Sequence, residues 1–489
     1  MGAHEDFKVT CMSKQVVAAA VPLQDHKLPL SNLDFLLPPL DVNVFFCYKK
    51  EEIIPKNSCN ENTLKHKVSV LKKALAQALA YFYPFAGEIV YNSAGEPEIL
   101  CNNRGVEFIE AFADVKLVEL NLYNPDQSVE GKLVPRKKDA VFSVQVTELK
   151  CGGIVIACAF DHRIADAYST NMFWVTWAEM ATFKPITMIP NLHRSLFSPR
   201  KPLDYNSNIY KMYLPISSLP APNPNEPDMG PLITRVYTIS KWQLNNLQAL
   251  CEDKDGENGC FKKYSKLQCF SAILWKIIAS HACELGVDNL NKTSMMGIVV
   301  DGRVRLSKEE SSEKQEAIST YFGNVLSIPF GEQNCEDLKE MLIGKLAKLV
   351  NNFVEMAAKK EHFLGLIDWV EARRPEPAVT KIYCTEDGDG PAFVMSSGLG
   401  FPVSKVDFGW GKPTFGSYHF PWGGNCGYVM PMPNAQENGD WVVYMHLHKE
   451  QLHYIEAKAS HLFQPFSLHK NYDRESGFVH LEQVPHSFG

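Results

Sequence analysis

The sequence predicts an α/β protein with two domains. Its 489 residues exceed what one ordinary hydrophobic core accommodates, which favours two large domains. A continuous apolar run at 152–160, GGIVIACAF, is typical of a buried strand, and a helical pattern follows it directly. Residues 214–232 contain six prolines with Ser, Asn and Gly, a composition that sustains neither helix nor central strand. We therefore expect domains over 1–213 and 233–489, joined by a linker over 214–232.

Apolar periodicity places the elements of the first domain. Apolar residues at steps of three and four indicate a helix over 64–83, which Pro84 ends. Alternation puts Val42, Val44 and Phe46 on one face of an early strand. The other expected elements are strands over 14–21, 87–92, 96–102, 106–112 and 152–160, and a helix that begins by Asp166.

The second domain repeats this alternation of strands and helices after the linker. MGIVVDGRVRL at 296–306 is interpreted as a second buried strand because its first half is almost wholly apolar. The other expected elements are strands over 234–239 and 441–448, and helices near 240–252, 265–285, 335–357, 360–374 and 449–460.

The composition is that of an ordinary globular protein, with 45% hydrophobic and 21% charged residues. A net charge of −7, without a basic patch interleaved with aromatic residues, argues against a nucleic-acid partner. Thirteen cysteines without CxxC spacing favour free thiols in a reducing compartment. No apolar run approaches membrane-spanning length and the N-terminus has no apolar signal region. We therefore expect a cytoplasmic protein with no membrane partner.

Several common kinds of active site have no counterpart in the sequence. A GxSxG nucleophile elbow, a P-loop and a complete GxGxxG motif are all missing. His446, His448 and His453 lie close together but do not form a metalloprotease pattern, so the sequence predicts no metal site.

His162 stands where the buried strand ends and the next helix begins. Ends of core strands are places where α/β proteins position reactive side chains. A histidine there can take up or release a proton near neutral pH. The local pattern fits a surface histidine at a strand end equally well.

DFGWG at 407–411 is the most unusual short stretch of the chain. Two glycines around Trp410 allow a tight turn with the indole packed against backbone. Asp407 can accept backbone N–H bonds that hold such a turn. We interpret Asp407, Gly409 and Trp410 as structural.

Several motifs, in this order along the chain, together resemble one known family. AFDHRIADAYS and DFGWGKP carry most of the specificity, because HxxxD alone is common whereas HxxxD followed at a distance by DFGWG is not. LSNLD at 30–34, YPFAG at 83–87, VVDGR at 299–303 and YFGN at 321–324 accompany them. The chain resembles the BAHD family of plant acyl-CoA-dependent acyltransferases over nearly its whole length. CNNRG, SVQVTELKCGGIV, SSGL and PWGG look most similar to the coniferyl alcohol acyltransferases within it.

The resemblance implies a two-domain fold of the chloramphenicol-acetyltransferase type with a solvent tunnel between the domains. Part of about 385–430 is then expected to cross over to the first domain. His162 would act as general base, without an acyl-enzyme intermediate. Asp166 would form a structural ion pair with an arginine, for which Arg303 or Arg305 is the candidate. An Asp-His dyad of the serine-protease kind is the less favoured alternative.

The resemblance also suggests where the substrates bind. Ser265 and Lys266 open a helix that suits the 3′-phosphate of CoA, although an ordinary capped helix explains them nearly as well. Asn324 is expected to line the thioester channel.

The expected acceptor pocket contains Val42, Val44 and Phe46, where relatives that acylate shikimate or quinate have Thr, Ser and Tyr. Gly398 stands where those relatives have a tryptophan, so Ser396 or Ser397 is the candidate oxyanion donor. These differences favour an apolar acceptor over a polyol.

Three hypotheses follow for the function. The first is acyl transfer, with acetyl-CoA as the suggested donor, to the hydroxyl of an apolar or aromatic alcohol such as coniferyl alcohol. The second uses an amine acceptor with the same chemistry. The third is a catalytically silent relative that binds a metabolite or a protein. The first two need acyl-CoA as co-substrate and no tightly bound cofactor, and we expect a monomer.

Overall fold

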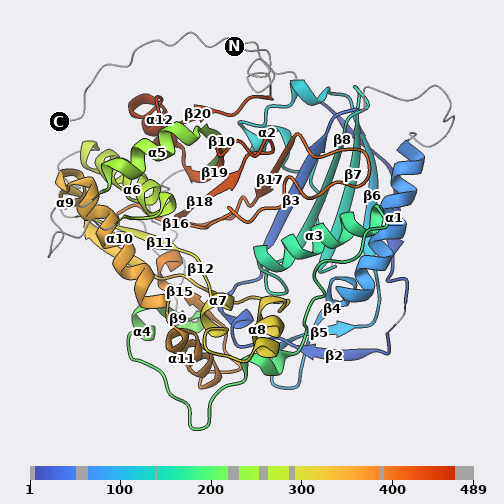
Figure 1. Ribbon diagram of the computed structural model, residues 1–489, viewed down its shortest axis with the longest axis horizontal. Coiled ribbons are helices and arrows are strands. Elements are labelled where there is room, and N and C mark those ends of the chain that lie inside the picture. Colours follow the sequence, from blue (N-terminus) through green and yellow to red (C-terminus); the bar gives the residue numbers. More distant parts are fainter. Residues whose placement is uncertain are drawn as a thin grey trace.

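The computed structural model describes residues 6–21, 23–50, 64–137, 140–218, 231–252, 263–285, 292–384 and 390–468. Two large sheets dominate it and lie in opposite halves of the molecule (Figure 1). Most of the expected 214–232 linker, from 219 to 230, lies outside the described residues. The division into domains at 1–213 and 233–489 therefore stays a proposal.

The first large sheet has six strands in the order β1-β6-β7-β8-β3-β17. Its strands are largely antiparallel, but β6 and β7 run parallel. Two helices that pack on each other, α1 and α3, lie against it (Figure 1). The bounds are β1 Val9–Val17, β3 Asp41–Tyr48, β6 Val106–Ala113, β7 Phe142–Leu149, β8 Ile154–Asp161, β17 Phe415–His419, α1 Leu64–Tyr81 and α3 Ala167–Ala181.

The second large sheet has seven strands in the order β14-β11-β16-β18-β19-β10-β20. Apolar residues of its strands form one core with those of the adjacent helices, of which α6 contributes the fully buried Trp275. The strands are β10 Leu232–Ile239, β11 Thr293–Ile298, β14 Phe330–Asn334, β16 Ala392–Met395, β18 Cys426–Pro433, β19 Trp441–His448 and β20 Gln464–Pro465. The helices are α5 Lys241–Leu250, α6 Lys266–Glu284, α9 Cys335–Glu340, α10 Ile343–Ala357 and α12 Lys449–Lys458.

Smaller elements connect the two halves and cover their ends. The small strands are β2 His26–Pro29, β4 Glu88–Tyr91, β5 Pro97–Cys101, β9 Tyr213–Pro215, β12 Val300–Asp301, β13 Leu326–Ser327 and β15 Ala378–Thr380. The remaining helices are α2 Pro125–Ser128, α4 Ile209–Met212, α7 Arg303–Leu306, α8 Ser312–Ser319 and α11 Lys360–Glu371.

Strand β17 belongs to the first sheet although its neighbours in sequence belong to the second. It follows β16, pairs antiparallel with β3 from Phe415 opposite Cys47 to His419 opposite Asn43, and is followed by β18. Tyr48 anchors the approach to β17, because its hydroxyl donates a 2.8 Å hydrogen bond to the carbonyl of Val406. The late part of the chain thus completes the early sheet.

The structure differs from the sequence expectations at several elements. The first strand lies at Val9–Val17 and not at 14–21, and β7 had not been expected. The strand expected over 296–306 is divided: β11 ends at Ile298, and β12 pairs with β13 in a separate small sheet. After β12 the Asp301 carboxylate accepts from the N–H of Arg303 at 2.8 Å, where the short helix α7 begins. The helix expected over 335–357 is divided into α9 and α10.

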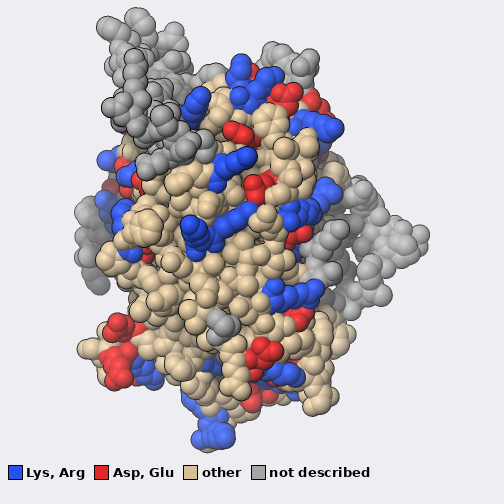
Figure 2. Space-filling view, turned by 90° about the vertical axis from the view of Figure 1, so that its right-hand side faces the viewer, with Lys and Arg blue, Asp and Glu red and all other residues tan. Residues whose placement is uncertain are grey.

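Charged side chains of both signs are interspersed on the face that α1 covers, around a broad uncharged area (Figure 2). Some form ion pairs between strands or between a helix and a strand, such as Lys72 with Glu110 at 2.5 Å. Such pairs near the surface add little to stability. None of the helices within the described ranges combines the length and apolar character needed to cross a membrane.

Replacing Phe46 by alanine should destabilise the first half of the molecule strongly. The Phe46 ring is fully buried and stacks on Phe401 at a centroid distance of 5.0 Å, with Trp174 at 4.8 Å. Truncating a buried phenylalanine costs about 3–5 kcal/mol. Denaturant unfolding should show this loss, whereas Phe183→Ala, at a residue that is 93% exposed, should leave the unfolding midpoint unchanged. Equal midpoints for the two variants would contradict the packing described here.

Candidate active site

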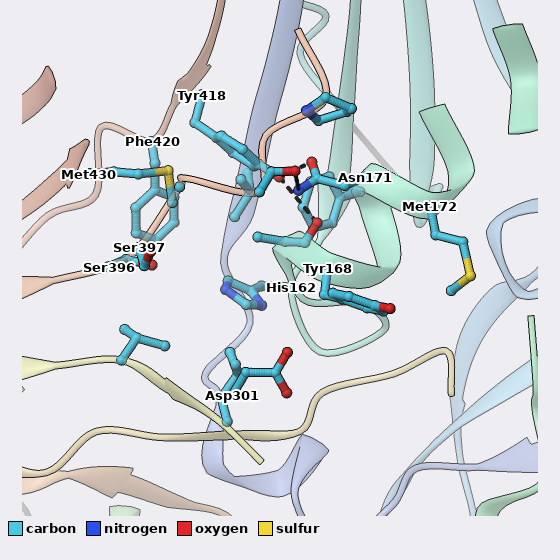
Figure 3. Close-up of a pocket in the computed structure, with 18 of the residues that line it drawn as sticks. His162, Tyr168, Asn171, Met172, Asp301, Ser396, Ser397, Tyr418, Phe420 and Met430 are labelled. Atoms are coloured by element: carbon cyan, nitrogen blue, oxygen red, sulfur yellow. Dashed lines mark hydrogen bonds between the residues drawn. The ribbon is translucent and has the colours of Figure 1, made fainter. Parts of the chain in front are cut away.

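His162 directly follows β8 and reaches a cavity between the two halves of the molecule (Figure 3). Its backbone N–H donates to the carbonyl of Leu40 at 2.8 Å. In the ring, Nδ1 is buried without a hydrogen-bond partner, and none of the described residues bonds to Nε2. The imidazole is therefore positioned by its backbone and by packing near Phe160 and Phe420, whose ring centroids lie at 6.3 and 6.4 Å.

Asn324 holds the loop that carries His162. Its side-chain amide donates to the carbonyls of His162 at 2.9 Å and of Arg163 at 3.2 Å. The Asn324 side chain and backbone N–H also both donate to Asp34, at 2.8 Å each. Asn324 is fully buried, so it supports the wall of the cavity from behind and does not line it, contrary to the expectation from the sequence.

Asp166 is fully buried and forms a two-pronged ion pair with Arg303. The guanidinium nitrogens Nη1 and Nη2 lie 2.8 and 3.1 Å from its two oxygens. The same carboxylate accepts the backbone N–H of Ser169 at 2.9 Å, which caps α3, and that of Val325 at 3.2 Å. These four donors occupy both oxygens, and none of the contacts of Asp166 with the described residues goes to His162.

Arg303 joins α3 to the segment that contains Asn324. Besides Asp166 it donates to the carbonyls of Tyr321 at 3.1 Å and Gly323 at 3.0 Å. Burial disfavours the charge of Arg303, but the nearby carboxylates of Asp166 and Asp301 outweigh it and raise the pKa of the guanidinium. Between the two arginines considered from the sequence, Arg303 makes this pair and Arg305 lies in a separate surface hollow.

The cavity beside His162 has a volume of about 1070 Å³ and is lined by both halves of the molecule. Most of its wall is apolar or aromatic. Six charged residues line it among the described ones: Glu179 and Lys184 near the end of α3, Lys405, Asp407 and Lys412 in the segment before β17, and Asp301, which Figure 3 shows below His162. Apolar and aromatic lining residues include Leu40, Val42, Met172, Val175, Ile328, Tyr383, Phe420, Trp422 and Met430.

The expected acceptor residues divide between the cavity and the core. Val42, Ser396 and Ser397 line the cavity. Val44 and Phe46 share the face of Val42 but lie further along β3 and are fully buried, so assigning them to the acceptor pocket was wrong. Both side chains lie in the core beyond the end of the cavity, where the Phe46 ring contacts Trp174 of α3.

Gly398 has no room for a side chain. A Cβ atom there would lie 2.6 Å from the Cγ atom of Met432 and 2.9 Å from the carbonyl oxygen of Pro431. The tryptophan that relatives acylating shikimate or quinate have at this position would therefore clash with β18 here. Beside it, burial raises the pKa of Tyr428 to about 12, with a hydrogen bond to Ser396 acting in the opposite direction. Tyr428 is thus a neutral phenol near neutral pH.

The DFGWG segment forms the tight turn expected from its glycines. One oxygen of Asp407 accepts the N–H groups of Gly409 at 2.8 Å and Gly411 at 3.0 Å. Both glycines have positive φ, 104° and 101°, which favours glycine. Trp410 packs on Phe408 at 5.7 Å, and the Lys67 ammonium lies 5.1 Å from its ring centroid. The turn therefore fixes the segment before β17 to the first half.

Ser265 caps helix α6 in the ordinary way. Its hydroxyl accepts the N–H of Gln268 at 3.2 Å, and the Gln268 side chain accepts the N–H of Ser265 at 2.8 Å. Ser265 is exposed and Lys266 half-buried, and residues 253–262 ahead of them lie outside the described residues. Their binding of CoA stays a prediction.

Some residues that build the site were not singled out from the sequence. Asp34, at the start of a short 3-10 helix, accepts from Asn324 and from the Ser31 hydroxyl at 2.8 Å. The LSNLD motif contained it, but nothing in the motif showed its partner. Asn171 and Tyr418 line the cavity together. Tyr418 has no local sequence signal because β17 reaches the site only through its pairing with β3.

Comparison with known proteins identifies the class. The sequence profile described as "Transferase family" matches residues 7–462. A hydroxycinnamoyl-CoA:5-hydroxyanthranilate N-hydroxycinnamoyltransferase of Avena sativa is 25% identical over 466 residues, which cover 91% of this chain and 98% of the relative. An omega-hydroxypalmitate O-feruloyl transferase of Arabidopsis thaliana is 26% identical over 404 residues, 78% of each chain. The crystal structure of vinorine synthase superposes with a TM-score of 0.67 at 19% identity, over 94% of this chain and 100% of that one.

The fold and the site define a two-domain α/β acyltransferase of the chloramphenicol-acetyltransferase type. The chain belongs to the Transferase family, that of the BAHD acyltransferases, and is an enzyme with acyl-CoA as co-substrate.

Asp166→Asn should destabilise the protein by about 3–5 kcal/mol, because it leaves the buried charge of Arg303 without its main partner. The same change should lower acyl transfer, since α3 and the His162 loop lose their common anchor. Denaturant unfolding and initial rates would measure both effects. Asp114→Asn, in the exposed pair with Lys150, is the matched control and should change neither. Equal unfolding midpoints for the two variants would remove Asp166 as the anchor.

Proposed function

We propose that this protein transfers an acyl group, with acetyl-CoA as donor, to the hydroxyl of an apolar or aromatic alcohol such as coniferyl alcohol. The observation that carries the proposal is the His162 imidazole, which lines a largely apolar cavity and whose Nε2 is bonded by none of the described residues. Such a base can accept a proton only from a molecule that enters the cavity.

His162 acts as the general base in a direct transfer. Its free ring nitrogen takes the proton of the acceptor hydroxyl while the oxygen attacks the thioester carbonyl. The tetrahedral intermediate collapses, the C–S bond breaks, and CoA leaves as a thiolate that receives the proton. Ser396 or Ser397, both at the cavity wall, is the proposed donor to the oxyanion.

Asp166 takes no part in the proton transfer. Its ion pair with Arg303 fixes the loop that carries His162 relative to the second half of the molecule. A base held in place beside both substrates contributes to the rate by orientation as well as by proton transfer.

The lining of the cavity supports an apolar acceptor. Val42 and Met172 offer no hydrogen bond to the ring hydroxyls of a polyol, and each unpaired buried hydroxyl costs about 1–3 kcal/mol. A flat aromatic alcohol instead buries its ring against such side chains. Aromatic residues such as Phe420 and Trp422 line the same cavity.

An amine acceptor is the second candidate. The relative from Avena sativa is named as an N-hydroxycinnamoyltransferase, and a general base serves an amine as well as an alcohol. Both relatives described above are named for hydroxycinnamoyl or feruloyl transfer, so hydroxycinnamoyl-CoA is the alternative donor. We further propose that the enzyme is a monomer in the cytoplasm. Its buried free cysteines, such as Cys47 and Cys158, support a reducing compartment.

CoA release from acetyl-CoA in the presence of coniferyl alcohol should fall about 10²–10⁴-fold in His162→Ala, because the proton acceptor is lost. The same assay with feruloyl-CoA in place of acetyl-CoA compares the two candidate donors. With an aliphatic amine added as a competitor of the alcohol, the mass of the product shows whether an ester or an amide is formed. The melting temperature should change little, because none of the described residues forms a hydrogen bond with the ring. Equal rates of CoA release in wild type and His162→Ala would show that His162 is not the general base. If amides were the only products, the acceptor would be an amine and not an alcohol.

Lys266→Ala should raise the KM for acetyl-CoA about tenfold, because Lys266 is proposed to contact the 3′-phosphate at the start of α6. The KM for acetyl-dephospho-CoA, which lacks that phosphate, should be the same in both proteins. Lys241→Ala, at the start of the neighbouring helix α5, is the control and should leave both constants unchanged. If Lys266→Ala raised the KM for both donors equally, Lys266 would not be the contact of the 3′-phosphate.

A further inference from the structure

We infer that Asn171 and Tyr418 form a subsite for a second hydroxyl group of the acceptor, at the end away from the hydroxyl that is acylated. This inference rests on the proposed alcohol acyltransferase and names the kind of alcohol that the site selects. Asn171 lies on α3 and Tyr418 on β17, and Figure 3 shows the two together on the wall above His162.

The two side chains are bonded to each other in a fixed arrangement. The Tyr418 hydroxyl donates to the side-chain oxygen of Asn171 at 2.9 Å and approaches the carbonyl of Ala167 at 3.3 Å. Ala167 and Asn171 are one helical turn apart on α3, so all three groups lie on the same face of the helix. Tyr418 is only 3% exposed, and its ring packs on Phe401 at 5.3 Å. The pair is therefore rigid.

This arrangement leaves one donor and one acceptor unused. The hydroxyl of Tyr418 has a single hydrogen, which it gives away, and the described residues supply no donor to its oxygen. The side-chain nitrogen of Asn171 has two hydrogens, and its one contact, to the carbonyl of Gly400, is 3.4 Å long. Ordinary N–H···O bonds measure about 2.7–3.2 Å. An N–H and an oxygen lone pair are thus both available at the cavity.

A hydroxyl group is the ligand that satisfies both. Its oxygen accepts from the Asn171 nitrogen, and its hydrogen goes to the Tyr418 oxygen. The neighbouring lining residues Met172 and Val175 offer nothing polar, and Asn171 is the only carboxamide among the cavity-lining residues described. A polar pair kept in apolar surroundings favours a ligand that completes its bonds and disfavours one that leaves them open.

The subsite lies on the acceptor side of the cavity. The proposed function places CoA on the second half of the molecule, near Ser265 and Lys266, whereas Asn171 belongs to α3 of the first half. The acceptor is therefore an alcohol with an apolar ring and a phenolic hydroxyl, and not a simple aliphatic or unsubstituted aromatic alcohol.

The test compares 4-hydroxycinnamyl alcohol with cinnamyl alcohol, which differ only in the phenolic hydroxyl. The ratio of kcat/KM for the two alcohols should be about 10 or more in wild type and fall to about 1 in Asn171→Leu. The effect should be mainly on KM, because the contact is remote from the reacting oxygen. Tyr418→Phe should lower the ratio in the same direction and serves if Asn171→Leu does not fold. Met172→Leu, in the same stretch of wall, should leave the ratio as it is.

The two levels of the proposal fail in different ways. A ratio near 1 in wild type, or one that neither variant lowers, overturns the hydroxyl subsite while leaving the alcohol acyltransferase intact. Acylation of neither alcohol, with turnover of an amine, overturns both.

Discussion

The buried ion pair between Asp166 and Arg303 is the interaction on which the rest of the site depends. It connects the N-terminus of α3 with α7, through two residues that are 137 positions apart in the chain. Burying two charges is costly unless the geometry is good and the remaining hydrogen bonds are made. Here the fork of the guanidinium meets both carboxylate oxygens, and backbone carbonyls of Tyr321 and Gly323 take its other N–H groups. The pair thus fixes one relative position of these segments.

That structural use of the carboxylate has a chemical consequence. In a catalytic dyad an aspartate orients the imidazole and stabilises its charge, but Asp166 has no oxygen left for His162. The histidine is held instead by its own backbone, through Leu40 and Asn324, and Asn324 is held in turn by Asp34. None of the described residues bonds Nε2 of the ring, which is therefore left for a substrate.

The cavity combines residues that are far apart in sequence because β17 crosses to the first sheet. This strand brings Tyr418 beside α3, and the turn of DFGWG fixes the segment that leads to it. The segments on either side of the crossover carry Ser396, Ser397 and Trp422 to the same cavity. Changes in this one segment can alter the acceptor wall while the backbone contacts of His162 to Leu40 and Asn324, which lie elsewhere, are kept.

The sequence by itself determined the buried strand β8, the histidine at its end and the helix that follows, because apolar periodicity and the break at Asp161 are local features. It also gave Arg303 as one of two candidate partners for Asp166. Only the tertiary structure decided between Arg303 and Arg305, moved Val44 and Phe46 into the core, and placed Asn324 behind the cavity wall. The physical reason is that these outcomes depend on where a strand leaves the cavity and which segment packs behind a loop. Such contacts form between residues more than a hundred positions apart, and no local pattern of side chains encodes them.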